Sequence, residues 1–184
     1  MKGIVFTEFL ELVEDRFGLD TCDHILESSD LESGGAYTSV GTYDHRELVQ
    51  LVGHLSEHVG VDASELVRVF GEYLFGRFVE LYPAFFEDVT DGVEFLTRVE
   101  QHIHVEVKKL YPDAELPSFE YSQDGAVTSV VYRSQRAFGD LAHGLIAACL
   151  AHFGTDCELE RFEEEGAGGT VVRFELTRNP QPVA

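Results

Sequence analysis

The pattern of apolar residues changes near residue 117, and this change limits the folds that the chain can adopt. Up to about residue 111, apolar residues recur every three to four positions, which is typical of amphipathic helices. Residues 118–133 and 156–177 instead alternate between apolar and polar side chains around short polar turns, which indicates β-hairpins. The order predicts an α+β fold, with a helical N-terminal half and a C-terminal half of antiparallel sheet plus helices.

Residues that cap or break helices divide the chain into segments. Gly18, Gly60 and Gly154 follow apolar periodic stretches, and Pro83 is expected to interrupt the helical pattern. Residues 29–43 are rich in Gly and Ser and predict a loop. The predicted helices cover residues 2–17, 20–28, 44–59, 62–81, 91–111 and 138–153. The predicted strands cover residues 118–123, 126–133, 156–164 and 169–177.

Length and composition indicate one domain. The chain has 184 residues, of which 44% are hydrophobic, enough to bury a core. We expect a single domain over residues 1–178, with a helical part at 1–82, a sheet part at 83–178 and a frayed tail at 179–184. No secretory signal, lipidation motif or run of 18 apolar residues occurs, so a cytoplasmic location is expected.

Charge and cysteine content narrow the possible partners. The net charge of −21 disfavours nucleic acid and anionic membranes, because both are themselves anionic. Cys22, Cys149 and Cys157 form no C-x-x-C pair and are expected to be reduced thiols. The sequence contains no P-loop, metalloprotease helix or pattern of nucleophile and base, so an enzyme is not expected.

Two stretches carry residues suited to binding. One predicted helix contains His102 and His104, and a neutral imidazole can bind a metal through one ring nitrogen. Tyr132, Ser134 and Arg136 are two apart, so in a strand their side chains point to one face. A phenol, a hydroxyl and a guanidinium suit a pair of carboxylates, and together with a metal ligand they describe a haem pocket. Periodicity does not decide between the two histidines, and an ordinary polar strand face would also explain the second stretch.

With these features the chain resembles the haem nitric oxide/oxygen-binding (H-NOX) family, the sensor domain shared by soluble guanylate cyclase and bacterial stand-alone proteins. The marks of the family are a single axial histidine and a Y-x-S-x-R motif, which here is Tyr132, Ser134 and Arg136. The family's histidine lies seven residues before a Tyr-Pro pair, which assigns that role to His104. Further matches, spread over nearly the whole chain, are Met1-Lys2-Gly3, Phe70-Gly71, Tyr111-Pro112 and Leu116-Pro117-Ser118-Phe119.

The resemblance implies a haem b buried between the two halves. Binding would be non-covalent, because the chain has no C-x-x-C-H motif. His104 would bind the iron, and Tyr132, Ser134 and Arg136 would bind the propionates. Pro117 would pack against the porphyrin and bend it, and such distortion is one way in which a protein tunes the reactivity of the iron. The implied haem pocket is otherwise apolar: Val5, Phe9, Leu74, Phe75, Phe78, Leu141 and Leu145.

The same resemblance also implies which diatomic gases the haem would bind. Oxygen-binding members place a tyrosine in the distal wall, but the matching residue here is Leu141. Without a hydrogen-bond donor, the wall is expected to favour NO and CO over O₂; Tyr73 and His143 are the nearest candidate donors. A sensor that signals by releasing its axial histidine to a histidine kinase or cyclic-di-GMP enzyme is therefore expected. The alternatives are an O₂ or redox sensor with the same fold, and a haem-free ligand-binding or protein-interaction module.

Overall fold

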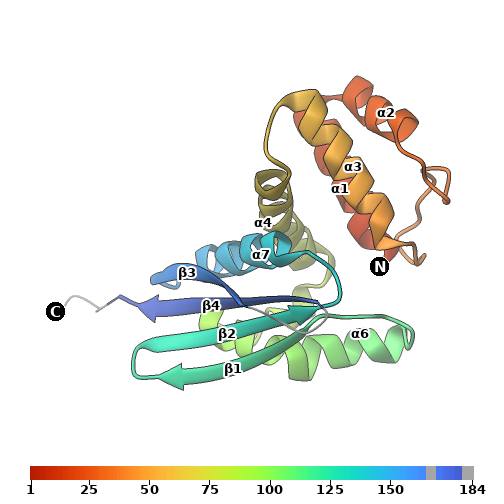
Figure 1. Cartoon of the computed structure of the whole chain (residues 1–184). Helices are drawn as coiled ribbons and strands as arrows, with labels where there is room; N and C mark the ends of the chain where they lie inside the picture. The colour runs from red at the N-terminus through yellow and green to blue at the C-terminus, as the bar shows by residue number, and fades with distance from the viewer. Residues whose placement is uncertain (165–168, 180–184) are drawn as a thin grey trace.

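The N-terminal part of the chain is helical, as predicted. A computed structural model describes residues 1–164 and 169–179. Figure 1 shows α1, α2 and α3 on one side of the molecule and the sheet on the other, with α4 between them. The N-terminal helices are α1 (Gly3–Phe17), α2 (Leu19–Ser28), α3 (His45–Val59) and α4 (Ala63–Leu81), followed by a short 3₁₀ turn, η1 (Pro83–Phe85).

Local capping explains where the third helix begins and ends. The side chain of Asp44 accepts a hydrogen bond from the backbone N–H of Arg46, at 2.9 Å, at the start of α3. Gly60 ends the helix in the left-handed conformation, with φ at 70°, which a side chain would disfavour. The helices α1–α4 then pack around a first core that includes Phe6, Phe9 and Phe70. Both helix boundaries confirm the prediction from sequence.

The C-terminal part is a four-stranded antiparallel sheet, which confirms the α+β fold class. Its strands are β1 (Ser118–Asp124), β2 (Val127–Ser134), β3 (Cys157–Glu164) and β4 (Thr170–Arg178), in the spatial order β1-β2-β4-β3. Gly125, with φ at 59°, turns the first hairpin. The predicted turn of the second hairpin at 165–168 and most of the predicted frayed tail, 180–184, lie outside the described residues.

One face of the sheet carries a second core. Val130 of β2 pairs with Phe174 of β4, and both side chains are almost fully buried. Helices α5 (Gly92–Arg98) and α7 (Gly139–His152) supply the other side of this core. Leu145 of α7 contacts both the first and the second core, so α7 links the two halves of the molecule.

The helix predicted at residues 91–111 is divided into three segments. After α5, residues Val99–Ile103 form a π-helix, η2, and α6 (His104–Leu110) follows. The backbone N–H of His104 bonds to the carbonyl of Val99, five residues earlier instead of four. The π-helix adds a residue to the turn before His104, and such turns are frequent at functional sites. Within residues 1–164 and 169–179, no helix has the length and apolar character needed to cross a membrane.

Candidate functional site

His104 is a partly buried imidazole with one nitrogen already bonded. Its side chain is 13% exposed, and Nδ1 lies 3.0 Å from Oε2 of Glu100. Burial lowers the pKa of His104, while the hydrogen bond and charge of Glu100 oppose this shift. A carboxylate can only accept a hydrogen bond, so Nδ1 carries the proton in the neutral ring. Nε2 is therefore the nitrogen with a lone pair available for a metal ion.

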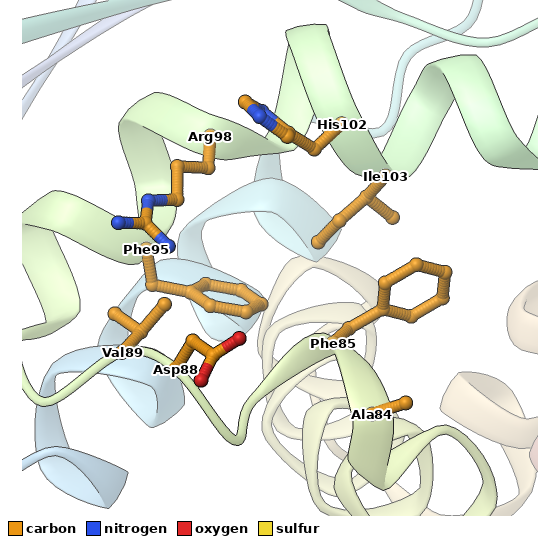
Figure 2. A pocket seen from close by; sticks show the side chains of 8 residues that line it. All are labelled: Ala84, Phe85, Asp88, Val89, Phe95, Arg98, His102 and Ile103. Atoms are coloured by element: carbon orange, nitrogen blue, oxygen red, sulfur yellow. The ribbon is translucent and has the colours of Figure 1, made fainter.

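His102 lies in a different environment from His104. Figure 2 shows it at the edge of a separate pocket, together with Arg98 and Ile103. This pocket has a volume of about 160 Å³, and it is lined on its other side by residues of η1 and the segment after it. His102 is exposed, whereas His104 is mostly covered. The structure thus separates two histidines that helical periodicity could not distinguish.

The Tyr132, Ser134 and Arg136 motif spans the end of β2. Tyr132 is buried, but the strand ends at Ser134, so Arg136 lies beyond it and the expectation of one continuous strand is wrong for Arg136. The hydroxyl oxygen of Ser134 accepts a hydrogen bond from the backbone N–H of Arg136, at 3.1 Å. Burial raises the pKa of Tyr132, and Ser134 and Arg136 act in the opposite direction. The three side chains are therefore neighbours, although only two belong to the strand.

Arg136 has an ion-pair partner that the sequence did not indicate. Its guanidinium is 12% exposed and donates to the carbonyl oxygen of Glu115 at 3.1 Å and to the Glu115 carboxylate at 2.5 Å. The Glu115 side chain itself is 84% exposed. An exposed carboxylate on a mostly covered guanidinium can be exchanged for another anion at little cost, because water solvates the released carboxylate.

Two further basic groups lie near Arg136. The amino group of Met1 donates to the carbonyl oxygen of Tyr43 at 2.6 Å, and its pKa is lowered by burial and by the charge of Arg136. The pKa of His45 is lowered by the same two causes. Met1, His45 and Arg136 lie far apart in the sequence, so their spacing could not predict that they come together in the fold. In a protein with a net charge of −21, such a cluster is a local site for an anion.

Phe119 lies between the histidine and the motif. It pairs with Tyr132 across β1 and β2. Its ring centroid is 5.7 Å from that of His104 and 5.7 Å from that of Tyr132. Phe119 therefore contacts both the candidate metal ligand and Tyr132 of the candidate carboxylate clamp.

Most of the predicted distal wall belongs to one apolar cluster. Phe9 and Leu74 are buried there, and the partly buried side chains packed against the cluster include Val5, Phe78, Leu141 and Leu145. Phe75 instead packs in the second core, 5.7 Å from Phe86 and 6.1 Å from Phe95 between ring centroids. Pro117 is partly buried immediately before β1.

The two candidate hydrogen-bond donors lie among charged groups. Burial and the nearby carboxylate of Glu8 raise the pKa of Tyr73, which is also close to Arg77. The ring of His143 is 5.8 Å from that of Phe174 in the second core, and burial and the charge of Arg161 lower its pKa. Tyr73 therefore lies near the Glu8–Arg77 ion pair, and His143 lies on the sheet side of α7.

The residues that the structure describes fit a haem better than a protein-bound metal ion. Across residues 1–164 and 169–179, no three His, Cys, Asp or Glu side chains are grouped as a metal site. A single imidazole with a free Nε2 suffices for haem, because the porphyrin supplies the other nitrogen ligands. The guanidinium of Arg136, together with the hydroxyl groups of Tyr132 and Ser134, suits the two propionates of a haem. The fold and the site together define a domain of the haem-sensor class.

Comparison with known proteins identifies the family. Residues 2–161 match the haem-NO-binding family, and the chain belongs to this family. A search of curated proteins finds no match. The solved structure of the Fe(II) unliganded H-NOX protein from K. algicida is 40% identical with a TM-score of 0.89, and the match covers 100% of both chains.

Two other solved structures extend the comparison. The H-NOX from Shewanella woodyi, bound to IWP-051 in the Fe(II)CO state, is 43% identical with a TM-score of 0.83, covering 100% of this chain and 97% of that one. An H-NOX protein from S. oneidensis in the Fe(II)NO state is 23% identical with a TM-score of 0.83, covering 97% of this chain and 100% of that one. The last similarity supports the fold alone.

Proposed function

We propose that this chain is a haem-based sensor of NO and CO, with haem b held non-covalently and no catalytic step of its own. The observation that carries the proposal is the geometry of His104, a mostly covered imidazole whose Nδ1 lies 3.0 Å from the Glu100 carboxylate, which leaves Nε2 for a metal. When bound, ferrous haem supplies an open coordination position for a diatomic gas. His104 would hold the iron through Nε2.

Arg136 is the main residue for holding the propionates. Its guanidinium can bind a carboxylate through two parallel N–H groups; at present one of them donates to the backbone carbonyl oxygen of Glu115 and the other to its carboxylate. A propionate would replace the exposed Glu115 side chain, while Ser134 keeps the backbone of Arg136 in place. Tyr132 and Ser134 add hydroxyl donors. The Met1 amino group and His45 lie near Arg136, whose charge contributes to lowering the pKa of both.

The apolar distal wall supports selection of NO and CO over O₂. Bound O₂ carries partial negative charge and gains from a hydrogen-bond donor, whereas NO on ferrous iron gains little. Leu74, Leu141 and Leu145 offer no donor, and the ring of His143 lies against Phe174 in the second core. Tyr73 packs against the same cluster as these leucines and is the donor that an O₂ sensor in this fold would have to use.

The segment that carries His104 is suited to move. Asp91 caps α5 and pairs with Arg178 at 2.7 and 2.9 Å, which ties the start of that helix to the end of the sheet. By contrast, none of the residues of η2 and α6 is fully buried. Few buried contacts mean a low cost of local opening. Release of His104 on NO binding would therefore free η2 and α6 and change the surface offered to a partner such as a histidine kinase or cyclic-di-GMP enzyme.

An absorption spectrum of the purified protein tests this function. The protein is loaded with haem, reduced, and exposed separately to air and to NO. A Soret band that responds to NO, with no stable spectrum in air, is the expected result. A stable spectrum in oxygenated buffer would assign the protein to O₂ sensing. The absence of a Soret band after reconstitution would leave the haem-free interaction module as the function.

A further inference from the structure

Glu100 connects the proposed axial histidine to the sheet. Its Oε2 atom accepts a hydrogen bond from Nδ1 of His104 at 3.0 Å and another from the backbone N–H of Phe119 at 3.3 Å. One carboxylate oxygen thus joins η2, α6 and β1. The family resemblance did not assign a role to this residue, and the sequence gave no indication of its contact with Phe119, which spans 19 residues.

The carboxylate of Glu100 lies next to the His104 ring. Among the residues described, no Lys or Arg side chain forms a salt bridge with Glu100, and His104 is its one histidine partner, at 3.0 Å; the charge of Glu100 also contributes, after burial, to the raised pKa of Tyr121. The carboxylate is 35% exposed, so it is partly shielded from water. A carboxylate that accepts the Nδ1 proton increases the electron density at Nε2 and so strengthens the ring as a metal ligand.

Glu100 and His104 lie four residues apart, a spacing that puts both side chains on one face of the helical segment. Glu100 is the second residue of η2 and His104 is the residue immediately after it. The wider turn shifts the direction of every side chain that follows, compared with a regular α-helix. Since the His104 N–H bonds to Val99 and its Nδ1 bonds to Glu100, both the backbone and the ring are held by consecutive residues of this turn.

We propose that Glu100 is a positioning residue for the axial ligand, and that it determines how strongly His104 holds the haem iron. The carboxylate fixes the ring tautomer and orientation, and through Phe119 it anchors the ring to β1. A strong hydrogen bond at Nδ1 makes Nε2 a better donor and raises the threshold at which His104 leaves the iron. The inference rests on the proposed function and goes beyond it, because it assigns control of the signal to a residue that does not touch the cofactor.

The test compares Glu100→Gln and Glu100→Ala with the wild type in the haem-loaded ferrous protein. Resonance Raman measures the iron–histidine stretching band, and transfer to an apo-globin measures haem loss. Glu100→Gln keeps an oxygen acceptor and removes the charge, so the band should move to lower frequency while the haem is retained. Glu100→Ala should lower the band further and accelerate haem loss roughly 10-fold, as is typical when a ligand's hydrogen-bond partner is removed.

A control on the same helix separates this effect from general loss of charge. Glu106 pairs with Lys109 at 2.6 Å and is 47% exposed, so Glu106→Gln should leave the Raman band unchanged. An unshifted band in Glu100→Gln would overturn the proposal, whatever happens to stability. If Glu100→Ala fails to fold by circular dichroism, the Glu100→Gln spectrum decides alone. A wild-type protein without a Soret band would instead refute the proposed function, which keeps the two failures distinct.

Discussion

Gly71 of α4 and Gly144 of α7 lie where the backbones of these two helices touch. A Cβ atom on Gly71 would come within 3.0 Å of the carbonyl oxygen of Leu141, and one on Gly144 would come as close to the carbonyl oxygen of Arg68. Real Cβ atoms essentially never approach backbone atoms so closely. The two glycines therefore set the distance between α4, which carries Leu74 and Phe78, and α7, which carries Leu141 and Leu145.

Replacing Gly144 by alanine should destabilise the protein. The methyl group can be accommodated only if α4 and α7 move apart, and overpacking of this kind costs about 1–3 kcal/mol. Urea unfolding followed by circular dichroism measures the change. Gly76→Ala in α4 is the matched control, because nothing lies within 4 Å of the position that its Cβ atom would take, and the better helix propensity of alanine should stabilise by about 0.5–1 kcal/mol. Equal effects of the two substitutions would contradict the close helix contact.

Substitution of the two neighbouring histidines should give opposite results. His104→Ala should lose the axial ligand, because the partly buried Nε2 has no replacement in the same position. His102→Ala should keep the wild-type absorption spectrum, since this side chain lies at the edge of a separate pocket. The spectra of the reduced proteins provide the measurement. Loss of haem from His102→Ala would show that the assignment of the axial histidine is wrong.

Arg136→Ala should weaken haem retention. The substitution removes the bidentate donor and leaves only hydroxyl groups for the propionates, and hydrogen bonds to charged groups contribute about 1.5–3 kcal/mol. The rate of haem transfer to an apo-globin should rise accordingly. Arg133→Ala is the control, because Arg133 is exposed and lies 3.4 Å from Glu120. If both variants release haem at the wild-type rate, Arg136 is not a propionate ligand.

Leu141→Tyr should allow the protein to hold O₂. The leucine belongs to the apolar cluster with Phe9 and Leu74, and a phenol there would donate a hydrogen bond to bound O₂. The expected observation is a spectrum in air that persists in the variant and not in the wild type. Leu141→Phe adds a ring without the hydroxyl and should behave like the wild type. An O₂ spectrum in the phenylalanine variant would attribute the effect to shape and not to the hydrogen bond.

The ion pair of Asp91 with Arg178 should make stability depend on pH. The hydrogen bond from Arg178 lowers the pKa of Asp91 below its usual value in the folded protein. The stabilisation is therefore fully present above the usual aspartate pKa of about 4 and is lost as the pH falls through the lower folded-state pKa. Asp91→Asn keeps a capping side chain and should cost about 0.5–1 kcal/mol at pH 7.

Urea unfolding of the wild type and of Asp91→Asn at neutral and acidic pH measures this contribution. The difference between the two proteins should shrink as the pH falls, because the wild-type carboxylate becomes protonated. Asp113→Asn, in the exposed loop after α6, is the control and should differ little from the wild type at either pH. A difference that stays constant with pH would mean that Asp91 acts only as a helix cap.

The sequence by itself determined the elements of the fold and the motif residues that their order along the chain defines. Asp44 and Gly60 marked the ends of α3, and the alternation around Gly125 marked the first hairpin, because capping and strand alternation depend on neighbours within a few residues. The resemblance to the family, through the spacing of the histidine to Tyr111-Pro112, singled out His104 as the candidate axial ligand.

Only the tertiary structure decided which side chains surround the site. Helical periodicity could not choose between His102 and His104, and the structure shows that His102 is exposed and His104 mostly covered. The Glu100–Phe119 bond and the Arg136–Glu115 pair join segments 19 and 21 residues apart. Such contacts depend on how helices pack against the sheet, and local propensity carries no information about that packing.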